Sequence, residues 1–136
     1  MKAATFIDTV YLLALLNPRD RWHDRALAVS QSITGPFVTT LAVLTEVADA
    51  LAQRQHRRWA MESIDDIRND ENITCVAVTT EVFAAALRLY GDRPDKDWSL
   101  TDCVSFVVMR EQRMTDALTA DVHFTQAGFR ALLLEA

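Results

Sequence analysis

The chain has 136 residues, of which 50% are hydrophobic and 24% are charged, and its formal net charge at pH 7 is −5. This length favours one folded domain spanning residues 1–136, and the charge argues against a protein that holds nucleic acid by bulk electrostatics alone. An acidic site that a bound metal neutralises is still compatible with a nucleic-acid enzyme. The apolar run Val10–Leu16 is too short to span a bilayer, so we expect neither a signal peptide nor a membrane anchor. Cys75 and Cys103 lack CxxC spacing and predict two buried thiols in a cytoplasmic protein.

The first half of the chain predicts an alternation of strands and helices. Residues 3–7 are expected to form a short strand, followed by an apolar helix at 10–16 that ends at Asn17-Pro18. A second helix is expected from about residue 20 until Gly35-Pro36 breaks it, with five apolar side chains facing inward: Trp22, Ala26, Leu27, Val29 and Ile33. Residues 37–40 predict a strand and residues 41–53 a helix, and a polar hinge at 53–58 precedes an amphipathic helix that ends at about residue 68.

The second half continues the same alternation. A strand is predicted at 73–78, a helix at 80–90 that Gly91 ends, and a polar loop at 91–97. Residues 99–112 predict a buried helix with Ser99 as its N-cap, and residues 114–119 and 130–134 predict a strand and an edge strand. The whole pattern predicts an α/β fold with three layers, α/β/α, in which helices cover both faces of a central parallel sheet.

Four carboxylates are placed where such a fold binds its ligands. Asp8 and Asp121 come just after predicted strands, whereas Glu46 and Asp102 lie in the first turns of predicted helices. Ligands of an open parallel sheet bind beyond the carboxyl ends of its strands, so we expect these four side chains to converge at one edge. Carboxylates that close together repel unless a cation lies between them, and oxygen ligands without a nearby histidine or cysteine select Mg²⁺ or Mn²⁺. The expected chemistry is metal-assisted attack of water on a phosphodiester.

Each of these acids also has an ordinary structural explanation when it is considered alone. Asp8 and Asp121 are typical turn or cap residues, Asp102 is a typical residue of a helix N-terminus, and Glu46 is compatible with a solvated helix face. Their joint placement is what favours a site. Three further acids are weaker candidates because they precede a strand or lie in a loop: Asp116, Asp95 and Asp97.

Four stretches carry a resemblance to a known family: FIDTVYLLALL at 6–16, TTLAVLTEV at 39–47, DKDWSLTDCVSF at 95–106 and ALTADVHFTQAGF at 117–129. Together with the order of the elements they resemble the PIN-domain family, in the branch of VapC-like toxin ribonucleases from type II toxin–antitoxin modules. The resemblance covers essentially the whole chain and implies a sheet of four to five parallel strands. It maps the acidic residues of the family onto Asp8, Glu46, Asp102 and Asp121. Some members carry a further acid two positions after the last of these, where this chain has His123.

For a metal-dependent nuclease we assign Asp8, Asp102 and Asp121 to the metal. Glu46 is expected either to hold a water ligand of the metal or to act as the general base. Two threonines, Thr9 and Thr101, are expected to support the acids by hydrogen bonds, with helix capping as the alternative.

Substrate binding needs positive charge outside the acidic cluster. The densest basic run, which also contains His56, supplies three arginines: Arg54, Arg57 and Arg58. The alternative for this run is a solvated hinge beside the C-terminal end of a helix. His123 is a weak candidate for RNA contact, and capping of the following turn is its alternative.

The resemblance implies a Mg²⁺- or Mn²⁺-dependent endoribonuclease that is the toxin of its module, with RNA as substrate, a cognate antitoxin as partner, and a homodimer as its assembly. An apolar groove beside the helices at 10–16 and 41–53 is expected to receive a helix of the antitoxin. The alternative is a catalytically idle PIN-fold module that only binds protein, although an idle carboxylate cluster lowers stability by repulsion. A phosphoacceptor receiver domain is disfavoured, because the strand at 73–78 is not followed by the required aspartate.

Overall fold

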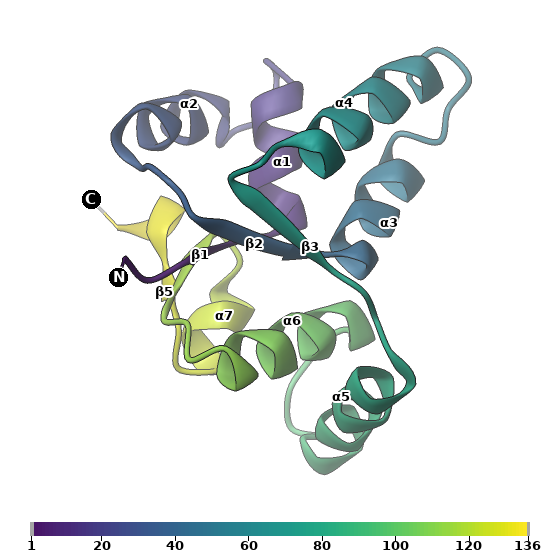
Figure 1. The fold of residues 1–136 in the computed structure, drawn as a ribbon, viewed down its shortest axis with the longest axis vertical. Helices are drawn as coiled ribbons and strands as arrows, with labels where there is room; N and C mark the ends of the chain where they lie inside the picture. Colours follow the sequence, from purple (N-terminus) through teal and green to yellow (C-terminus); the bar gives the residue numbers. More distant parts are fainter. Residues whose placement is uncertain (1, 136) are drawn as a thin grey trace.

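The computed structural model describes residues 2–135 and is built around a sheet of five parallel strands (Figure 1). The strands are β1 (Thr5–Ile7), β2 (Phe37–Thr40), β3 (Ile73–Val76), β4 (Asp116–Leu118) and β5 (Arg130–Ala131). Their order across the sheet is β3-β2-β1-β4-β5. The first strand of the chain is therefore central, and the predicted parallel sheet is confirmed.

Helices cover both faces of this sheet. In Figure 1, α1 (Thr9–Leu16), α2 (His23–Ser32), α3 (Leu41–Ala50) and α4 (Arg57–Asn69) lie above it, and α5 (Thr80–Asp92), α6 (Leu100–Glu111) and α7 (Val122–Gln126) lie below it. The predicted three-layer arrangement is thus confirmed. No helix within residues 2–135 is both long enough and apolar enough to cross a membrane.

Three phenylalanines at the centre of the core connect β1 to the two helices below it. Phe6 of β1, Phe106 of α6 and Phe124 of α7 are each 0% exposed. The ring of Phe124 lies 5.0 Å from that of Phe106 and 6.2 Å from that of Phe6, measured between centroids. Burial of an aromatic ring stabilises a core by a few kcal/mol, about 3–5 on truncation to alanine. This packing fixes the beginnings of α6 and α7 relative to the end of β1.

Several predicted boundaries were wrong, and the structure shows why. The helix α5 passes through Gly91 and ends at Asp92, because one exposed glycine costs only about 1 kcal/mol, whereas Pro94 stops the residue before it from being helical. The edge strand predicted at 130–134 is shorter: Arg130 and Ala131 pair with β4, and Leu132–Leu134 form a 3₁₀ turn. The strand β4 has only three residues and offers no partner for a longer β5.

The short helix α7 was not predicted at all. Asp121 is its N-cap and accepts a hydrogen bond from the backbone N–H of His123. Gly128 follows with a φ of 96°, a conformation that favours glycine, and the Phe129 N–H returns to the Phe124 carbonyl at 3.0 Å. Capping at both ends therefore forms a helix whose five residues are too few for a periodic sequence pattern.

Two burial predictions also need correction. Leu27 was expected to face inward but is 41% exposed, because it lies about 100° around the helix from the buried Ala26. Cys103 is buried as predicted, whereas Cys75 on β3 is only half-buried. Both cysteines are free thiols.

Candidate metal centre

The carboxyl ends of β1 and β4 meet at the point where the order of the strands reverses. From β1 the chain proceeds outward through β2 and β3, and it later returns to form β4 on the other side of β1. Ile7 is paired with Leu118 in parallel register, so the residues that follow, Asp8 and Thr119, also lie side by side. Open α/β sheets bind their ligands in the crevice at such a switch point.

Asp8 is buried at this switch point and is only 4% exposed. Its Oδ2 accepts a hydrogen bond of 2.7 Å from Thr119 Oγ1, and its side chain makes no capping hydrogen bond to α1. Burial raises the pKa of the Asp8 carboxyl from 3.8 to about 7, the Thr119 hydrogen bond lowers it, and the charges of Asp102 and Asp121 raise it. A carboxyl in this setting is fully ionised at neutral pH only when a cation stabilises its charge.

Asp102 is held rigidly in the first turn of α6 by a capping box with Ser99. The Ser99 hydroxyl accepts from the Asp102 N–H at 3.0 Å, and Asp102 Oδ2 accepts from the Ser99 N–H at 3.1 Å. Burial raises the pKa of the Asp102 carboxyl, and the Asp121 charge raises it as well, whereas the Ser99 N–H and His123 lower it. The same oxygen lies 2.9 Å from His123 Nδ1.

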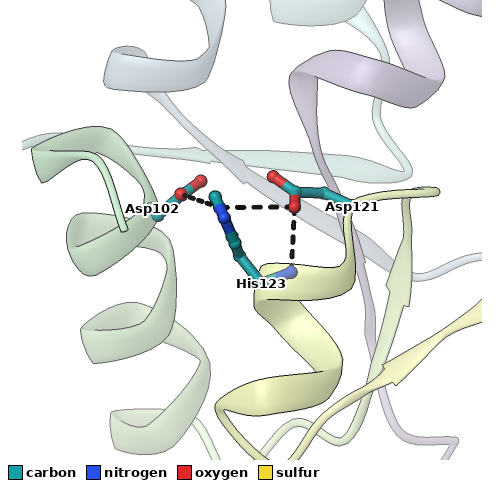
Figure 2. Close-up of side chains that lie close together, drawn as sticks. All are labelled: Asp102, Asp121 and His123. Carbon is teal, nitrogen blue, oxygen red and sulfur yellow. Dashed lines mark hydrogen bonds and ion pairs between the residues drawn. The ribbon is translucent and has the colours of Figure 1, made fainter. Parts of the chain in front are cut away.

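Asp121 and His123 complete the centre from the beginning of α7. Figure 2 shows the imidazole of His123 pointing between the carboxylates of Asp102 and Asp121. His123 Nδ1 lies 2.9 Å from Asp102 Oδ2 and 3.3 Å from Asp121 Oδ1. One donor atom from each of the three residues lies within 4.8 Å of the other two. The Asp121 N–H also bonds to Thr119 Oγ1 at 3.0 Å, which connects this group to Asp8.

Glu46 is joined to the same edge by a different threonine. Thr9, the first residue of α1, donates a hydrogen bond from Oγ1 to Glu46 Oε1 on α3. Because Thr9 directly follows Asp8, the carboxylate of Glu46 is held beside the beginning of α1. The hydrogen bond expected of Thr9 therefore exists, whereas the hydrogen bonds described for residues 2–135 include none from the side chain of Thr101.

The basic run predicted to bind substrate lies farther away. It spans the connection between α3 and α4 and the first two residues of α4, at the end of α3 that is remote from the sheet in Figure 1. Arg57 Nη1 donates to the Ala52 carbonyl at 3.2 Å, and Arg58 forms an exposed ion pair of 3.1 Å with Glu62. These contacts agree with the alternative given for this run, a solvated hinge beside the end of a helix. Arg54 is exposed.

Two of the weaker acidic candidates form ion pairs with arginines outside the switch point. Asp116 begins β4, at its amino end, and pairs with Arg130 at 3.3 Å. Asp95 pairs with Arg93 at 3.0 Å in the exposed loop after α5. These arginines neutralise the two carboxylates outside the switch point.

The donor set fits a divalent metal ion. Two carboxylates and an imidazole converge on one position, with the buried carboxyl of Asp8 bridged to them through Thr119. The sequence prediction assumed that no histidine lies near these acids, and this assumption was wrong because His123 lies among them. The sequence also did not identify Thr119, for which the only signal is a threonine two positions before an aspartate at a strand end.

Comparisons with known proteins show what the chain is similar to in sequence. No family model matches the sequence. The 23S rRNA-specific endonuclease VapC20 of Mycobacterium tuberculosis is 29% identical over 124 residues, which cover 91% of this chain and 94% of VapC20.

Solved structures extend the likeness to the fold. The crystal structure of VapC20, described as a Sarcin-Ricin loop cleaving toxin, aligns with a TM-score of 0.86 and 28% identity over 93% of this chain and 96% of VapC20. FitAcB from Neisseria gonorrhoeae has a TM-score of 0.68 at 15% identity over 93% of this chain and 94% of its own, and a toxin–antitoxin complex from Klebsiella pneumoniae has 0.63 at 13% over 88% of each chain. At these identities the last two show the fold alone. In sequence and fold this chain is therefore similar to VapC20 along nearly the whole length of both chains.

Proposed function

We propose that this protein is a metal-dependent endoribonuclease, the toxin of a type II toxin–antitoxin module, and that residues 1–136 act as a single PIN-like domain. The observation that supports this most directly is the convergence of Asp102, Asp121 and His123 at the switch point, with Asp8 bridged to them by Thr119. VapC20, which this chain resembles over nearly its full length, is named as an endonuclease specific for 23S rRNA. Ribosomal RNA is therefore the first substrate class to test.

In this proposal Asp8, Asp102 and Asp121 hold a divalent ion, Mg²⁺ or Mn²⁺. When bound, such an ion supplies an activated water and neutralises charge on the scissile phosphate. Ser99 fixes the orientation of the Asp102 carboxylate, and Thr119 fixes that of Asp8. Glu46, whose carboxylate accepts a hydrogen bond from Thr9, is proposed either to hold a water ligand of the ion or to act as the general base. Thr101 remains a proposed supporting residue.

Arg54, Arg57 and Arg58 are proposed to contact RNA away from the scissile phosphate. A helix rises 1.5 Å per residue, so the far end of the ten-residue α3 lies about 15 Å from the sheet. At that distance the arginines cannot reach the phosphate that is cut, but they can bind the backbone of a structured RNA several nucleotides away.

A protein antitoxin is the proposed regulatory partner, as in the complex of the structural neighbour from Klebsiella pneumoniae. The apolar hollow that suits a helix lies between α3 and α4, lined by Leu51, Ala60, Met61 and Ile64. It does not extend along α1 as predicted, because Leu12 on α1 and Leu44 on α3 are buried in the core. A homodimer is proposed through the exposed apolar stripe of α5: Phe83, Leu87 and Tyr90.

The test is RNA cleavage by the purified protein, free of antitoxin and of metal. Adding Mg²⁺ or Mn²⁺ should produce defined cuts in a panel of ribosomal and transfer RNAs, and chelation should abolish them. Asp8→Asn and Asp121→Asn should remove cutting while the circular dichroism spectrum stays native, and Asp116→Asn at the opposite end of β4 is the matched control. Persistent cleavage by both site variants would contradict the proposal.

The idle binding module remains the alternative, and thermal melting separates the two. An ion that binds only the folded state raises the melting temperature with its concentration. A wild-type melting temperature that does not respond to Mg²⁺ or Mn²⁺, together with intact RNA, would favour the idle module.

A further inference from the structure

We propose that His123 is a metal ligand through Nδ1 and that this nitrogen makes the centre prefer Mn²⁺ to Mg²⁺. The inference rests on the proposed function, since it concerns the same metal, but it assigns a residue and a selectivity that the four-carboxylate site does not contain. His123 is the position at which some PIN-domain proteins are expected to carry an acid. A nitrogen donor thus stands where an oxygen donor would otherwise be.

The first argument is the spacing of the donor atoms. Neighbouring ligands of an octahedral ion with bonds of about 2.1 Å lie about 3.0 Å apart, because they are separated by a right angle. His123 Nδ1 lies 2.9 Å from Asp102 Oδ2 and 3.3 Å from Asp121 Oδ1. Without an ion the shorter separation is that of a hydrogen bond, and both separations are short enough for an ion bound by the two carboxylates to reach Nδ1 as well.

The second argument is that hydrogen bonds of the backbone hold Asp121 beside the ring. His123 is the second residue of α7, and its N–H is bonded to Asp121 Oδ1 at 2.9 Å. Asp121 in turn is fixed by the Thr119 hydroxyl at 3.0 Å. Figure 2 shows the His123 ring between the two carboxylates, with Asp102 on one side and Asp121 on the other. The His123 side chain is 27% exposed, so the position is open to an ion from solvent.

The third argument is chemical. The tautomer of His123 with its proton on Nδ1 donates a hydrogen bond to the Asp102 carboxylate, whereas the tautomer with its proton on Nε2 offers the Nδ1 lone pair, and only the second can bind an ion through Nδ1. Imidazole binds first-row transition ions better than it binds Mg²⁺, which prefers oxygen and retains its waters. Replacing one oxygen donor by this nitrogen therefore shifts selectivity away from Mg²⁺.

The experiment measures binding and not activity. Calorimetric titration of the metal-free chain with MnCl₂ or MgCl₂ alone gives the two dissociation constants, and pulsed electron paramagnetic resonance of the Mn²⁺-loaded protein detects a coordinated histidine nitrogen. Wild type should show the nitrogen coupling and bind Mn²⁺ at least about tenfold more tightly than Mg²⁺. His123→Gln should lose the coupling and weaken Mn²⁺ binding by about tenfold or more, with little change for Mg²⁺.

Two further variants make the result specific. His123→Asp should restore tight binding without the nitrogen signal and reduce the preference for Mn²⁺, because it returns an oxygen donor to the position. His56→Gln, on the remote connection between α3 and α4, should behave as wild type. Coupling that persists in a folded His123→Gln protein, or equal affinities of wild type for the two ions, would overturn the inference.

RNA cleavage by the same samples separates this inference from the proposed function. Metal-dependent cutting without a nitrogen signal in wild type would overturn only the role of His123. A nitrogen signal without cutting would support that role and count against the nuclease. Absence of ion binding together with intact RNA would overturn both.

Discussion

Thr119 Oγ1 donates a hydrogen bond of 2.7 Å to Asp8 Oδ2, although 111 positions of sequence separate the two residues. The same hydroxyl oxygen accepts the N–H of Asp121 at 3.0 Å. Thr119 is 0% exposed, so water cannot replace either bond. One buried hydroxyl therefore sets the position of two proposed metal ligands on neighbouring strands.

Removal of this hydroxyl should damage the site more than the fold around it. Thr119→Val keeps the shape of the side chain but leaves the Asp8 carboxyl and the Asp121 N–H without a partner, which should cost about 1–3 kcal/mol of unfolding free energy. Mn²⁺ affinity, measured by calorimetry, should fall by about tenfold or more. Thr119→Ser, which keeps the hydroxyl, should retain most of both properties, and equal metal affinity in the valine variant would count against this role.

The raised pKa of Asp8 predicts how the stability of the metal-free protein depends on pH. Because the folded pKa of about 7 exceeds the ordinary value of 3.8, the folded state holds this proton more tightly than the unfolded chain. The resulting contribution to stability is complete below about pH 4 and is lost as the pH rises through about 7.

Asp8→Asn lacks the ionisable group and should avoid this loss. In urea unfolding with chelator at pH 8, we expect it to be more stable than wild type by about 2–4 kcal/mol, and the difference should vanish near pH 4. Asp116→Asn, at the other end of β4, should show no such gain. A metal-free Asp8→Asn protein that is less stable than wild type at every pH would contradict the prediction.

The capping box of α6 should matter to the chemistry as well as to the helix. Ser99→Ala removes the hydroxyl that accepts the Asp102 N–H and so loosens the first turn of α6, although the Ser99 N–H that holds the Asp102 carboxylate stays. It should cost about 1 kcal/mol of stability and reduce RNA cleavage severalfold. Thr79→Ala is a matched control, because Thr79 caps α5 by a bond of 3.1 Å to the Val82 N–H and lies outside the proposed site. Urea unfolding should show similar losses for the two variants, and only the first should cut slowly. Equal cleavage rates would mean that the cap serves the helix alone.

The exposed arginines between α3 and α4 should contribute through charge alone. Arg54→Ala with Arg58→Ala should weaken binding of single-stranded RNA and lower the slope of log affinity against log salt by about 0.7 for each phosphate that an arginine no longer neutralises. The measurement needs an Asp121→Asn background, in which the RNA is expected to stay intact. Arg88→Ala on the exposed face of α5 is the control, and an unchanged salt slope in the double variant would remove these arginines from the RNA-binding surface.

The sequence predicted the sheet well because its signals are local and strong. The β2 strand lies at Phe37–Thr40 as predicted, since Gly35-Pro36 before it and the threonine N-cap of α3 mark its two ends. The four acids were found by a rule about strand ends, and the structure places three of them close enough at one switch point for their charges to interact: Asp8, Asp102 and Asp121. Their roles at a metal stay a prediction.

The sequence did not reveal the parts of the site that depend on tertiary placement. His123 enters the centre only because α7 forms, and that helix is too short to leave a periodic pattern. Thr119 matters because β4 lies beside β1, and no property of the Thr119 segment alone specifies its neighbour. Leu27 was wrongly predicted to be buried, because it is apolar but lies on the exposed side of α2.

The pairing of β1 with β4 has a consequence for synthesis of the chain. Asp8 leaves the ribosome more than 100 residues before Thr119, Asp121 and His123, which lie after β4 and at the beginning of α7. Contacts between residues distant in sequence form late in folding. Until β4 docks, the edge of β1 that pairs with β4 is unpaired, and Asp8 lacks its hydrogen bond from Thr119. The proposed metal site is therefore incomplete in a nascent chain until α7 has been made and β4 has docked beside β1.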